Sequence, residues 1–317
     1  MNEMKILMIG NKNSGKTTYM TSSYGLLRDG KFGFTVSAES DIDSMLINNF
    51  CLLRDSGKYP SPSSSRQVYE FVLSYSGKPI LNFEWLDYYG GIINDTKTNE
   101  LPNDIEGADA AMLFVEGKAL LQNDREVTQL RRILYLIGRK IINRNKERLF
   151  TVIVVVTKYD EVPASASFEE VCRPLGDFLE AVKGKEGVYC SVVPVSCTSR
   201  RFVNVDLPLI DVLDSGMATK FFGHASAAYD HYMNGQKLQE RVGFFRRTLE
   251  IFVPFIDYDE DVRARREYGE AIEYINLMEE IQEPFEKLRE YRNSYSIVLP
   301  NRYSLAGKSR REQFGLL

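Results

Sequence analysis

The stretch MKILMIGNKNSGKT, residues 4–17, decides the fold. Its first six residues are apolar except for one lysine, which is typical of a short buried strand. The next eight match G-x-x-x-x-G-K-[ST], a loop whose backbone N–H groups surround a phosphate at the start of a helix. Gly10 and Gly15 permit backbone turns that a Cβ would hinder. The stretch therefore predicts a phosphate-binding loop between a buried strand and a helix.

The residue types in this loop indicate how each group meets a nucleotide. Lys16 is expected to reach the β- and γ-phosphates, and the Thr17 hydroxyl to ligate Mg²⁺, so both are candidate catalytic residues. The loop residues predicted to bind the nucleotide are Gly10, Asn13, Ser14, Gly15, Lys16, Thr17 and Thr18.

Composition narrows the class of protein. With 317 residues, 44% hydrophobic and 26% charged, the chain is typical of a soluble globular protein. Its net charge of −4 offers no basic excess for binding nucleic acid. No apolar run approaches the roughly 18 residues of a membrane span, and no leader is visible. We therefore expect a cytoplasmic protein with no nucleic-acid partner and no membrane span.

The cysteines and histidines do not predict a metal site. The four cysteines show no C-x-x-C spacing, which favours reduced, mostly buried thiols over zinc ligands or disulfides. His224 and His231 are seven residues apart, and packing or surface roles are favoured over metal binding.

Strands alternate with helices over the first two thirds of the chain. The predicted strands are residues 4–9, 34–40, 67–75, 80–86, 110–115, 151–156 and 189–195. The predicted helices are residues 18–29, 41–53, 124–145 and 168–182. Residues 67–86 read as one antiparallel hairpin. The pattern predicts an α/β domain over residues 1–207, with a mainly parallel sheet and helices on both faces.

The remaining residues, 208–317, predict a mostly helical extension. Apolar residues recur there at helical spacing, interrupted by Pro284, which should end or kink its helix. Residues 295–299 read as a strand, and a flexible tail follows Pro300. Residues 96–103 are polar and are expected to be mobile.

Two further motifs follow predicted strands. Because ligands of parallel sheets lie at the carboxyl ends of strands, we expect these motifs beside the phosphate loop. Residues 87–90 have the form D-x-x-G. Asp87 there would hold Mg²⁺ through water, and the Gly90 N–H would contact the γ-phosphate, which makes Gly90 a third candidate catalytic residue.

Residues 157–160 have the form [NT]-K-x-D, which predicts guanine binding. The Asp160 carboxylate can accept the N1–H and the exocyclic amine of guanine, whereas adenine has an acceptor at N1. The stem of Lys158 would cover the base, with Thr157 opening the motif. Ser196 and Cys197, after the last predicted strand, offer backbone N–H groups to guanine O6.

In this order the motifs resemble the GTPase superfamily of P-loop proteins, in its translation-factor and Ras-like class. The resemblance covers residues 1–207. Within that class the chain looks like bacterial double-GTPase-like proteins predicted to act in conflict or defence systems. Residues 9–18, 34–39 and 85–91 carry this narrower likeness. It implies binding of GTP and GDP with Mg²⁺.

The resemblance also shows where this chain departs from the family. Gly91 stands where Ras-like enzymes place the glutamine that orients the attacking water, which predicts weak intrinsic hydrolysis. The family expects a first-switch threonine on the metal and γ-phosphate; Thr35 is the candidate, with Ser37 and Ser40 as alternatives. The predicted metal ligands are thus Thr17, Asp87 and Thr35.

The sequence leaves three functions open. The leading one is a GTP-binding switch with slow Mg²⁺-dependent hydrolysis, which acts on a protein effector through its switch segments or helical extension. The others are a non-hydrolysing guanine-nucleotide scaffold and a P-loop ATPase. Arg54 and Arg66, in the long segment before residue 67, are candidates to reach the γ-phosphate in cis or across a dimer, although solvated roles are favoured for both.

Overall fold

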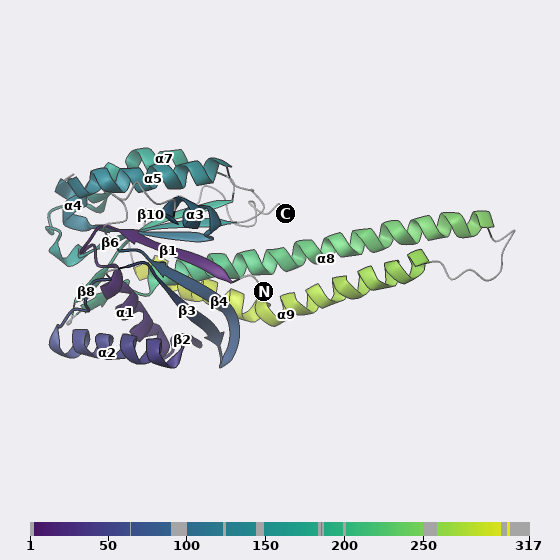
Figure 1. Ribbon diagram of the computed structural model, residues 1–317, viewed down its shortest axis with the longest axis horizontal. Coiled ribbons are helices and arrows are strands. Elements are labelled where there is room, and N and C mark those ends of the chain that lie inside the picture. Colours follow the sequence, from purple (N-terminus) through teal and green to yellow (C-terminus); the bar gives the residue numbers. More distant parts are fainter. Residues whose placement is uncertain are drawn as a thin grey trace. The chain divides into compact units, whose positions relative to one another are not determined.

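A computed structural model describes residues 3–63, 65–89, 100–122, 125–143, 149–182, 185, 187–198, 201–249, 259–298 and 303–304 (Figure 1). The chain divides into two compact units. The first comprises Met1–Gly216 and Lys287–Leu317, and the second comprises Met217–Glu286. The predicted extension, residues 208–317, begins within a long helix, but residues 208–216 and 287–317 belong to the first unit.

The first unit is built on a sheet that has eight strands in the described part of the chain, in the order β10-β7-β6-β5-β1-β4-β3-β2. The strands are β1 (Met4–Gly10), β2 (Phe34–Ala38), β3 (Gln67–Tyr75), β4 (Lys78–Asp87), β5 (Ala110–Glu116), β6 (Phe150–Thr157), β7 (Val188–Pro194) and β10 (Tyr303–Ser304). The neighbours from β4 to β7 pair in parallel, while β2, β3 and β10 pair antiparallel. The mainly parallel sheet and the β3–β4 hairpin are therefore confirmed.

Helices cover both faces of this sheet, as predicted. The helices are α1 (Lys16–Arg28), α2 (Ser40–Ser56), α3 (Glu100–Gly107), α4 (Gly117–Gln122), α5 (Arg125–Asn143), α6 (Phe168–Cys172), α7 (Gly176–Val182), α8 (Leu207–Leu249) and α9 (Asp259–Val298). Figure 1 shows α1 and α2 on one face and α3, α5 and α7 on the other. Short 3₁₀ turns, η2 (Tyr159–Glu161) and η3 (Arg173–Leu175), and a small ribbon of β8 (Ser196–Thr198) and β9 (Arg201–Val203) complete the unit.

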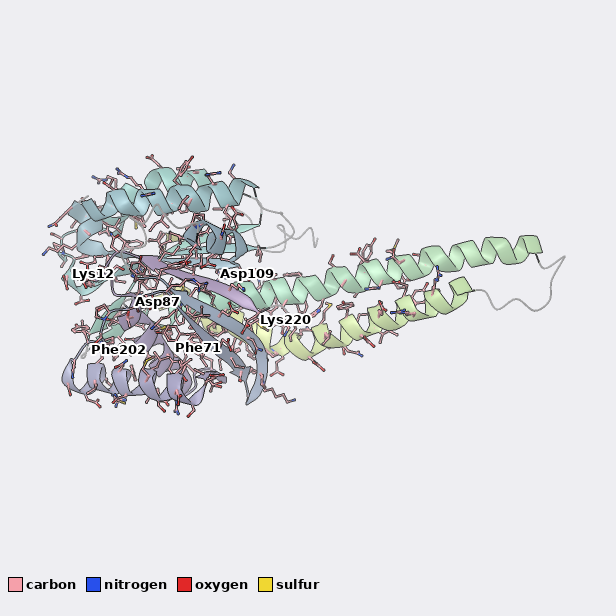
Figure 2. The ribbon with its side chains drawn as sticks, viewed as in Figure 1. Lys12, Phe71, Asp87, Asp109, Phe202 and Lys220 are labelled. Carbon is pink, nitrogen blue, oxygen red and sulfur yellow. The ribbon has the colours of Figure 1, made fainter. Side chains whose placement is uncertain are left out.

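The core forms because alternate residues of each central strand face opposite helical layers. In β1, Leu7 and Ile9 belong to the cluster that packs with α3, α5 and α7. On the other face an aromatic cluster surrounds Phe71 of β3, whose ring centroid lies 5.3 Å from that of Phe83 and 5.7 Å from that of Trp85 (Figure 2). Strand β6 is buried at all eight positions, which explains why residues 152–156 in its interior are all apolar.

Four local predictions need correction. Residues 100–103 open helix α3 instead of a mobile segment, because Leu101 and Ile105 bury their side chains in the core. The helix predicted over 168–182 is divided by η3, where a proline stands in the first turn. Helix α9 continues past Pro284 and through most of the strand predicted at 295–299, up to Val298.

The end of α9 is tied to the first unit by buried ion pairs. Arg292 donates from Nε to Asp211 Oδ1 and from Nη1 to Asp214 Oδ2, both at 2.9 Å. The two aspartate side chains, on the first turns of α8, are fully buried. Nearby, Asp206 Oδ2 accepts from Tyr291 Oη and from Lys31 Nζ, each at 2.6 Å. These bonds join α9 to α8 and to the loop after α1.

The second unit is an antiparallel pair formed by parts of α8 and α9. Within it Phe221 stacks on Phe285, with ring centroids 5.5 Å apart. His231 stacks on Tyr274, and its Nδ1 lies 2.7 Å from Glu267 Oε2. Among the described residues, no helix has both the length and the apolar character needed to cross a lipid bilayer.

We expect Arg292→Met to destabilise the protein by about 3–5 kcal/mol, because it removes the guanidinium that two buried carboxylates bond. Urea denaturation followed by circular dichroism measures the change. Arg266→Met serves as the matched control, because Arg266 pairs with Glu270 on the exposed surface of the same helix and should matter little. Equal midpoints for the two variants would contradict this account.

Candidate functional site

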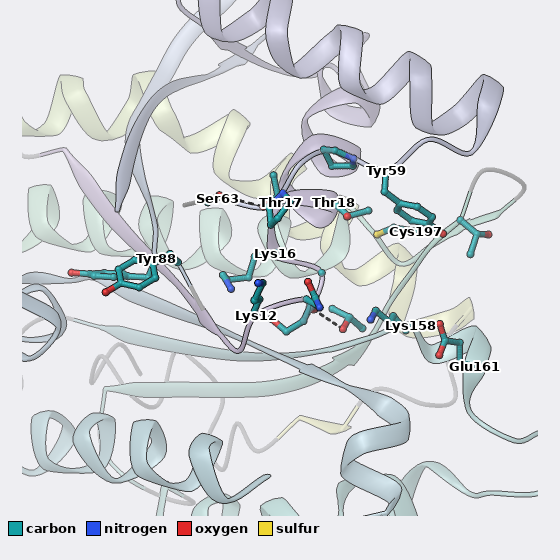
Figure 3. A pocket seen from close by; sticks show the side chains of 18 of the residues that line it. Lys12, Lys16, Thr17, Thr18, Tyr59, Ser63, Tyr88, Lys158, Glu161 and Cys197 are labelled. Carbon is teal, nitrogen blue, oxygen red and sulfur yellow. Dashed lines mark hydrogen bonds between the residues drawn. The ribbon is translucent and has the colours of Figure 1, made fainter. Parts of the chain in front are cut away.

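A cavity of about 390 Å³ opens at the carboxyl ends of β1, β4 and β6 (Figure 3). Its volume lies in the range of small-molecule sites in proteins. Its walls come from the phosphate loop, from the segment after α2, from the end of β4, from the turn after β6 and from β8. The residues that line it are Lys12, Asn13, Ser14, Gly15, Lys16, Thr17, Thr18, Tyr59, Pro60, Pro62, Ser63, Tyr88, Tyr89, Thr157, Lys158, Asp160, Glu161, Cys197 and Thr198.

The phosphate loop takes the conformation that its glycines predict. Asn13 and Gly15 have φ angles of 68° and 86°, in the left-handed region that favours glycine. A Cβ on Gly10 would lie 2.6 Å from the Phe114 carbonyl oxygen, so only glycine lets β1 end this close to β5. Helix α1 begins at Lys16, and its first turn therefore faces the cavity with unpaired backbone N–H groups and the positive end of its dipole.

The ammonium group of Lys16 lies against its own loop. Its Nζ donates to the carbonyl oxygens of Gly10 at 2.9 Å and Asn11 at 3.1 Å. Burial lowers the pKa of Lys16, and attraction to Asp87 opposes that shift. A phosphate group in the loop would supply the negative charge that this buried cation lacks.

A chain of polar groups joins the loop to β4. Thr17 Oγ1 lies 3.3 Å from Ser63 Oγ, which in turn donates to Asp87 Oδ2. Asp87 is fully buried, and its Oδ1 has no hydrogen-bond partner among the described residues. Burial raises the pKa of Asp87, against the lowering effects of the Ser63 bond and of Lys16. The hydroxyls of Thr17 and Ser63, which line the cavity, thus meet the carboxylate of Asp87, which is not among the lining residues.

The [NT]-K-x-D motif lies at the opposite side of the loop. Thr157 Oγ1 donates to the Ser14 carbonyl oxygen at 2.8 Å, so its hydroxyl fixes the phosphate loop. Lys158, with a φ of 49°, directs its ammonium to Glu116. Asp160 faces the cavity, and its Oδ1 accepts from Ser196 Oγ at 2.6 Å.

The residues of β8 contribute in different ways. Ser196 is absent from the cavity lining and acts on the site through its bond to Asp160. Cys197 lines the cavity beside Thr198, and burial raises the pKa of its thiol to about 12. The thiol therefore stays protonated at neutral pH, so the polar groups of this wall are the backbone and Thr198.

The structure does not bring Thr35 to the cavity, which corrects its predicted place on the metal. Residues 34–38 form the edge strand β2, and Thr35 pairs there with Ser74 of β3. Ser37 lies on the same strand, and Ser40 opens α2. Ser63 stands beside Thr17 instead. Sequence reasoning missed it because it is one of several serines in a segment that predicts only a loop.

The arginine and glycine candidates lie away from the cavity lining or outside the described part of the chain. Gly90 and Gly91 lie outside the described residues. Arg54, on α2, pairs with the adjacent Asp55 and is not among the cavity-lining residues. Arg66 Nε donates to Asp104 Oδ2 at 2.8 Å, and its guanidinium lies 5.9 Å from the ring centre of Tyr88, which lines the cavity.

The chemistry of the residues at the site suits the binding of a nucleotide and a divalent cation. Asp87 Oδ1 and Ser14 Oγ are both buried without a hydrogen-bond partner among the described residues. An unpaired carboxylate oxygen beside two hydroxyls suits a hard cation such as Mg²⁺. An unpaired hydroxyl inside a loop of inward N–H groups suits a phosphate oxygen.

The fold is an α/β domain with a mainly parallel sheet, helices on both faces and two long C-terminal helices. No protein-family model matches the sequence, and no curated protein matches it.

Among solved structures, the chain is similar to one described as "Signal recognition particle receptor SRb-GTP/SRX complex from Chaetomium thermophilum". The two are 15% identical, the match covers 62% of this chain and 92% of that chain, and the TM-score is 0.38. At this level the likeness carries no information on ligand or activity, so these depend on the residues of the cavity.

We expect Asp87→Asn to stabilise the ligand-free protein by about 1 kcal/mol at neutral pH, because it removes a buried charge kept for function. The folded-state pKa of Asp87 is raised. Wild-type stability should therefore fall as pH rises from the unfolded value, about 3.9, to the folded value, and then stay level. The variant should lack this dependence.

Thermal unfolding between pH 4 and 8 measures the effect, with Asp55→Asn as the control because Asp55 is exposed. The prediction is contradicted if Asp87→Asn is less stable than wild type across this range. It is also contradicted if the difference in stability between the two proteins does not change with pH.

Proposed function

We propose that this protein is a GTP-binding switch that hydrolyses GTP slowly with the help of Mg²⁺. One observation carries the proposal: a single cavity is lined by both the phosphate loop and Asp160, whose carboxylate would receive a base. Phosphate loops occur in both ATP- and GTP-binding proteins, so the base end of the cavity decides between them.

The base end favours guanine. Ser196 fixes the Asp160 carboxylate, and two oxygens remain able to accept further hydrogen bonds. Guanine presents two adjacent donors to such a group, whereas adenine presents an acceptor that the carboxylate repels. Lys158, whose ammonium is bonded to Glu116, lines the same cavity, and its stem would lie along the base.

The phosphate end supplies charge and metal ligands. Lys16 and the first-turn N–H groups of α1 would bind the phosphates. Thr17, Asp87 and, in place of Thr35, Ser63 would hold Mg²⁺, directly or through water. The cation, when bound, neutralises phosphate charge as the terminal bond breaks.

Slow hydrolysis follows from the residues of the cavity. Among the described residues that line it, none is a glutamine, a histidine or an arginine. Of the polar groups near the phosphate loop, the hydroxyls and Lys16 would bind charge, and the Asp87 carboxylate would be occupied by the cation. The same observation favours a second candidate, a guanine-nucleotide scaffold that does not hydrolyse GTP at all.

The signalling role belongs to the same proposal. Bound GTP would order the segment that carries Ser63 and the end of β4, and hydrolysis would release them toward a protein effector. Membership of a bacterial conflict system and dimerisation stay predictions from sequence.

Nucleotide selectivity tests the proposal. Calorimetry on wild type should show binding of GTP and GDP, but not ATP. Asp160→Asn should weaken GTP binding by roughly 10–100-fold, because mismatched buried polar groups cost about 1–3 kcal/mol. The same variant should bind xanthosine triphosphate more tightly than wild type does. Lys16→Ala should weaken the binding of all nucleoside triphosphates without changing the preference for one base over another. Equal affinity of wild type for ATP and GTP would instead support the ATPase alternative.

Single-turnover hydrolysis tests the enzymatic part. We expect a rate at or below the range of about 10⁻⁴ to 10⁻² s⁻¹ that Ras-like proteins show without an added arginine. Arg66→Ala is the informative variant, because Arg66 lies against the cavity-lining Tyr88, and Arg54→Ala is its control. A rate near 1 s⁻¹ at low protein concentration would contradict the expectation of slow hydrolysis and reveal a further catalytic group in the chain. No turnover in the presence of tight GTP binding would favour the scaffold.

A further inference from the structure

In the second unit, one histidine and two glutamates meet between the two long helices. His231 lies on α8, and Glu267 and Glu270 lie on the antiparallel α9 (Figure 1). The two glutamates are three residues apart, so they share one face of their helix. Each of the three side chains offers a ligand atom within 4.8 Å of the other two. Among the described residues, this is the one group of histidine, cysteine or carboxylate side chains that could hold a metal ion.

The cluster has more hydrogen-bond acceptors than protons to share. His231 Nδ1 lies 2.7 Å from Glu267 Oε2 and 3.2 Å from Glu270 Oε2, so two carboxylates meet at one ring nitrogen. That nitrogen carries at most one proton, and a single N–H has good geometry toward one acceptor at a time. A divalent ion in place of the proton would bond all three side chains and offset the charge of both carboxylates.

Two neighbouring side chains orient the three groups. The His231 ring stacks on that of Tyr274, with centroids 5.5 Å apart and an angle of 15° between the planes. Arg266 Nε donates to Glu270 Oε1 at 3.0 Å, which leaves the Oε2 atom toward His231. Outer contacts of this kind commonly orient metal ligands. The ring plane and one carboxylate are thus set by the fold itself.

The residue types and their exposure indicate the kind of ion. The three side chains are between 26% and 34% exposed, so an ion can enter from solvent and water can complete its coordination. An imidazole nitrogen with carboxylate oxygens suits Zn²⁺ and other first-row transition metals, whereas Mg²⁺ and Ca²⁺ prefer oxygen ligands alone. The cluster therefore differs in its chemistry from the candidate Mg²⁺ site at Asp87.

We propose that His231, Glu267 and Glu270 bind a divalent transition-metal ion such as Zn²⁺, which joins α8 to α9. The inference does not depend on the proposed function, because it concerns other residues in the other unit. The ligands come from both helices, so the site exists only in the folded hairpin. The bound ion should therefore stabilise this hairpin against unfolding.

Calorimetric titration of the whole, untagged chain with Zn²⁺ tests the site. Excess Mg²⁺ is present throughout, to occupy sites that have oxygen ligands only. His231→Gln should weaken binding at this site by about 10-fold or more, since the loss of an outer-shell partner alone costs roughly 10–100-fold. His224→Gln is the matched control. His224 is the other histidine of the chain and packs on the same Tyr274 ring, with centroids 5.8 Å apart, but lies outside the cluster.

Thermal unfolding followed by circular dichroism gives a second measurement. Zn²⁺ should raise the midpoint of wild type and of His224→Gln with increasing concentration, and should leave that of His231→Gln unchanged. A Glu267→Gln, Glu270→Gln double variant should behave as His231→Gln does, because it removes both charged ligands while keeping their shape. Glu273→Gln is its control, because Glu273 is an exposed glutamate on the same helix and outside the cluster. Spectra without metal verify that each variant is folded.

The outcomes are distinct. Loss of Zn²⁺ binding in His231→Gln and in the double glutamate variant, with retention in both controls, supports the site. Equal affinity in wild type and in these cluster variants shows that Zn²⁺ binds elsewhere and overturns the proposal, as does a wild type that binds no Zn²⁺. None of these results bears on guanine-nucleotide binding, so the proposed function is tested separately.

Discussion

One hydroxyl holds the phosphate loop in place. Thr157 Oγ1 bonds the carbonyl oxygens of Ser14 and of Val115, at 2.8 and 3.3 Å, so the loop, β5 and β6 meet at a single buried atom. The approach of Gly10 to Phe114 closes the same junction from the other side. This junction fixes the phosphate loop relative to β5 and β6.

The site holds two ionisable side chains in a buried place, where the charged form of each is disfavoured. Lys16 and Asp87 are both buried, and burial shifts the pKa of each toward its neutral form. Within the fold these groups partly compensate each other, but neither is fully satisfied, as the unpaired Asp87 Oδ1 shows for the described residues. A phosphate and a cation would relieve both, so stability and ligand binding are linked through the same two side chains.

The architecture could be predicted from sequence because local signals encode it. The apolar run of residues 152–156 predicts strand β6. The spacing of Gly10, Gly15 and Lys16 predicts the phosphate loop. The residues beside Thr17 could not be predicted, because their positions depend on contacts between residues far apart in the sequence. Thr35 occupies the expected position after the first helix, but pairing with Ser74 in β3 removes it from the cavity. Ser63 takes its place beside Thr17 only because α2 ends at Gly57.

The course of α9 has a consequence for how the chain is organised. Residues 217–286 leave the first unit through α8 and return to it through α9, so the second unit is inserted between the two segments of the first. Arg292 bonds Asp211 and Asp214, which places the exit and the return of the chain against each other. The sheet of the first unit is therefore completed by residues on both sides of the second unit, because β10, which pairs with β7, follows residues 217–286 in the chain.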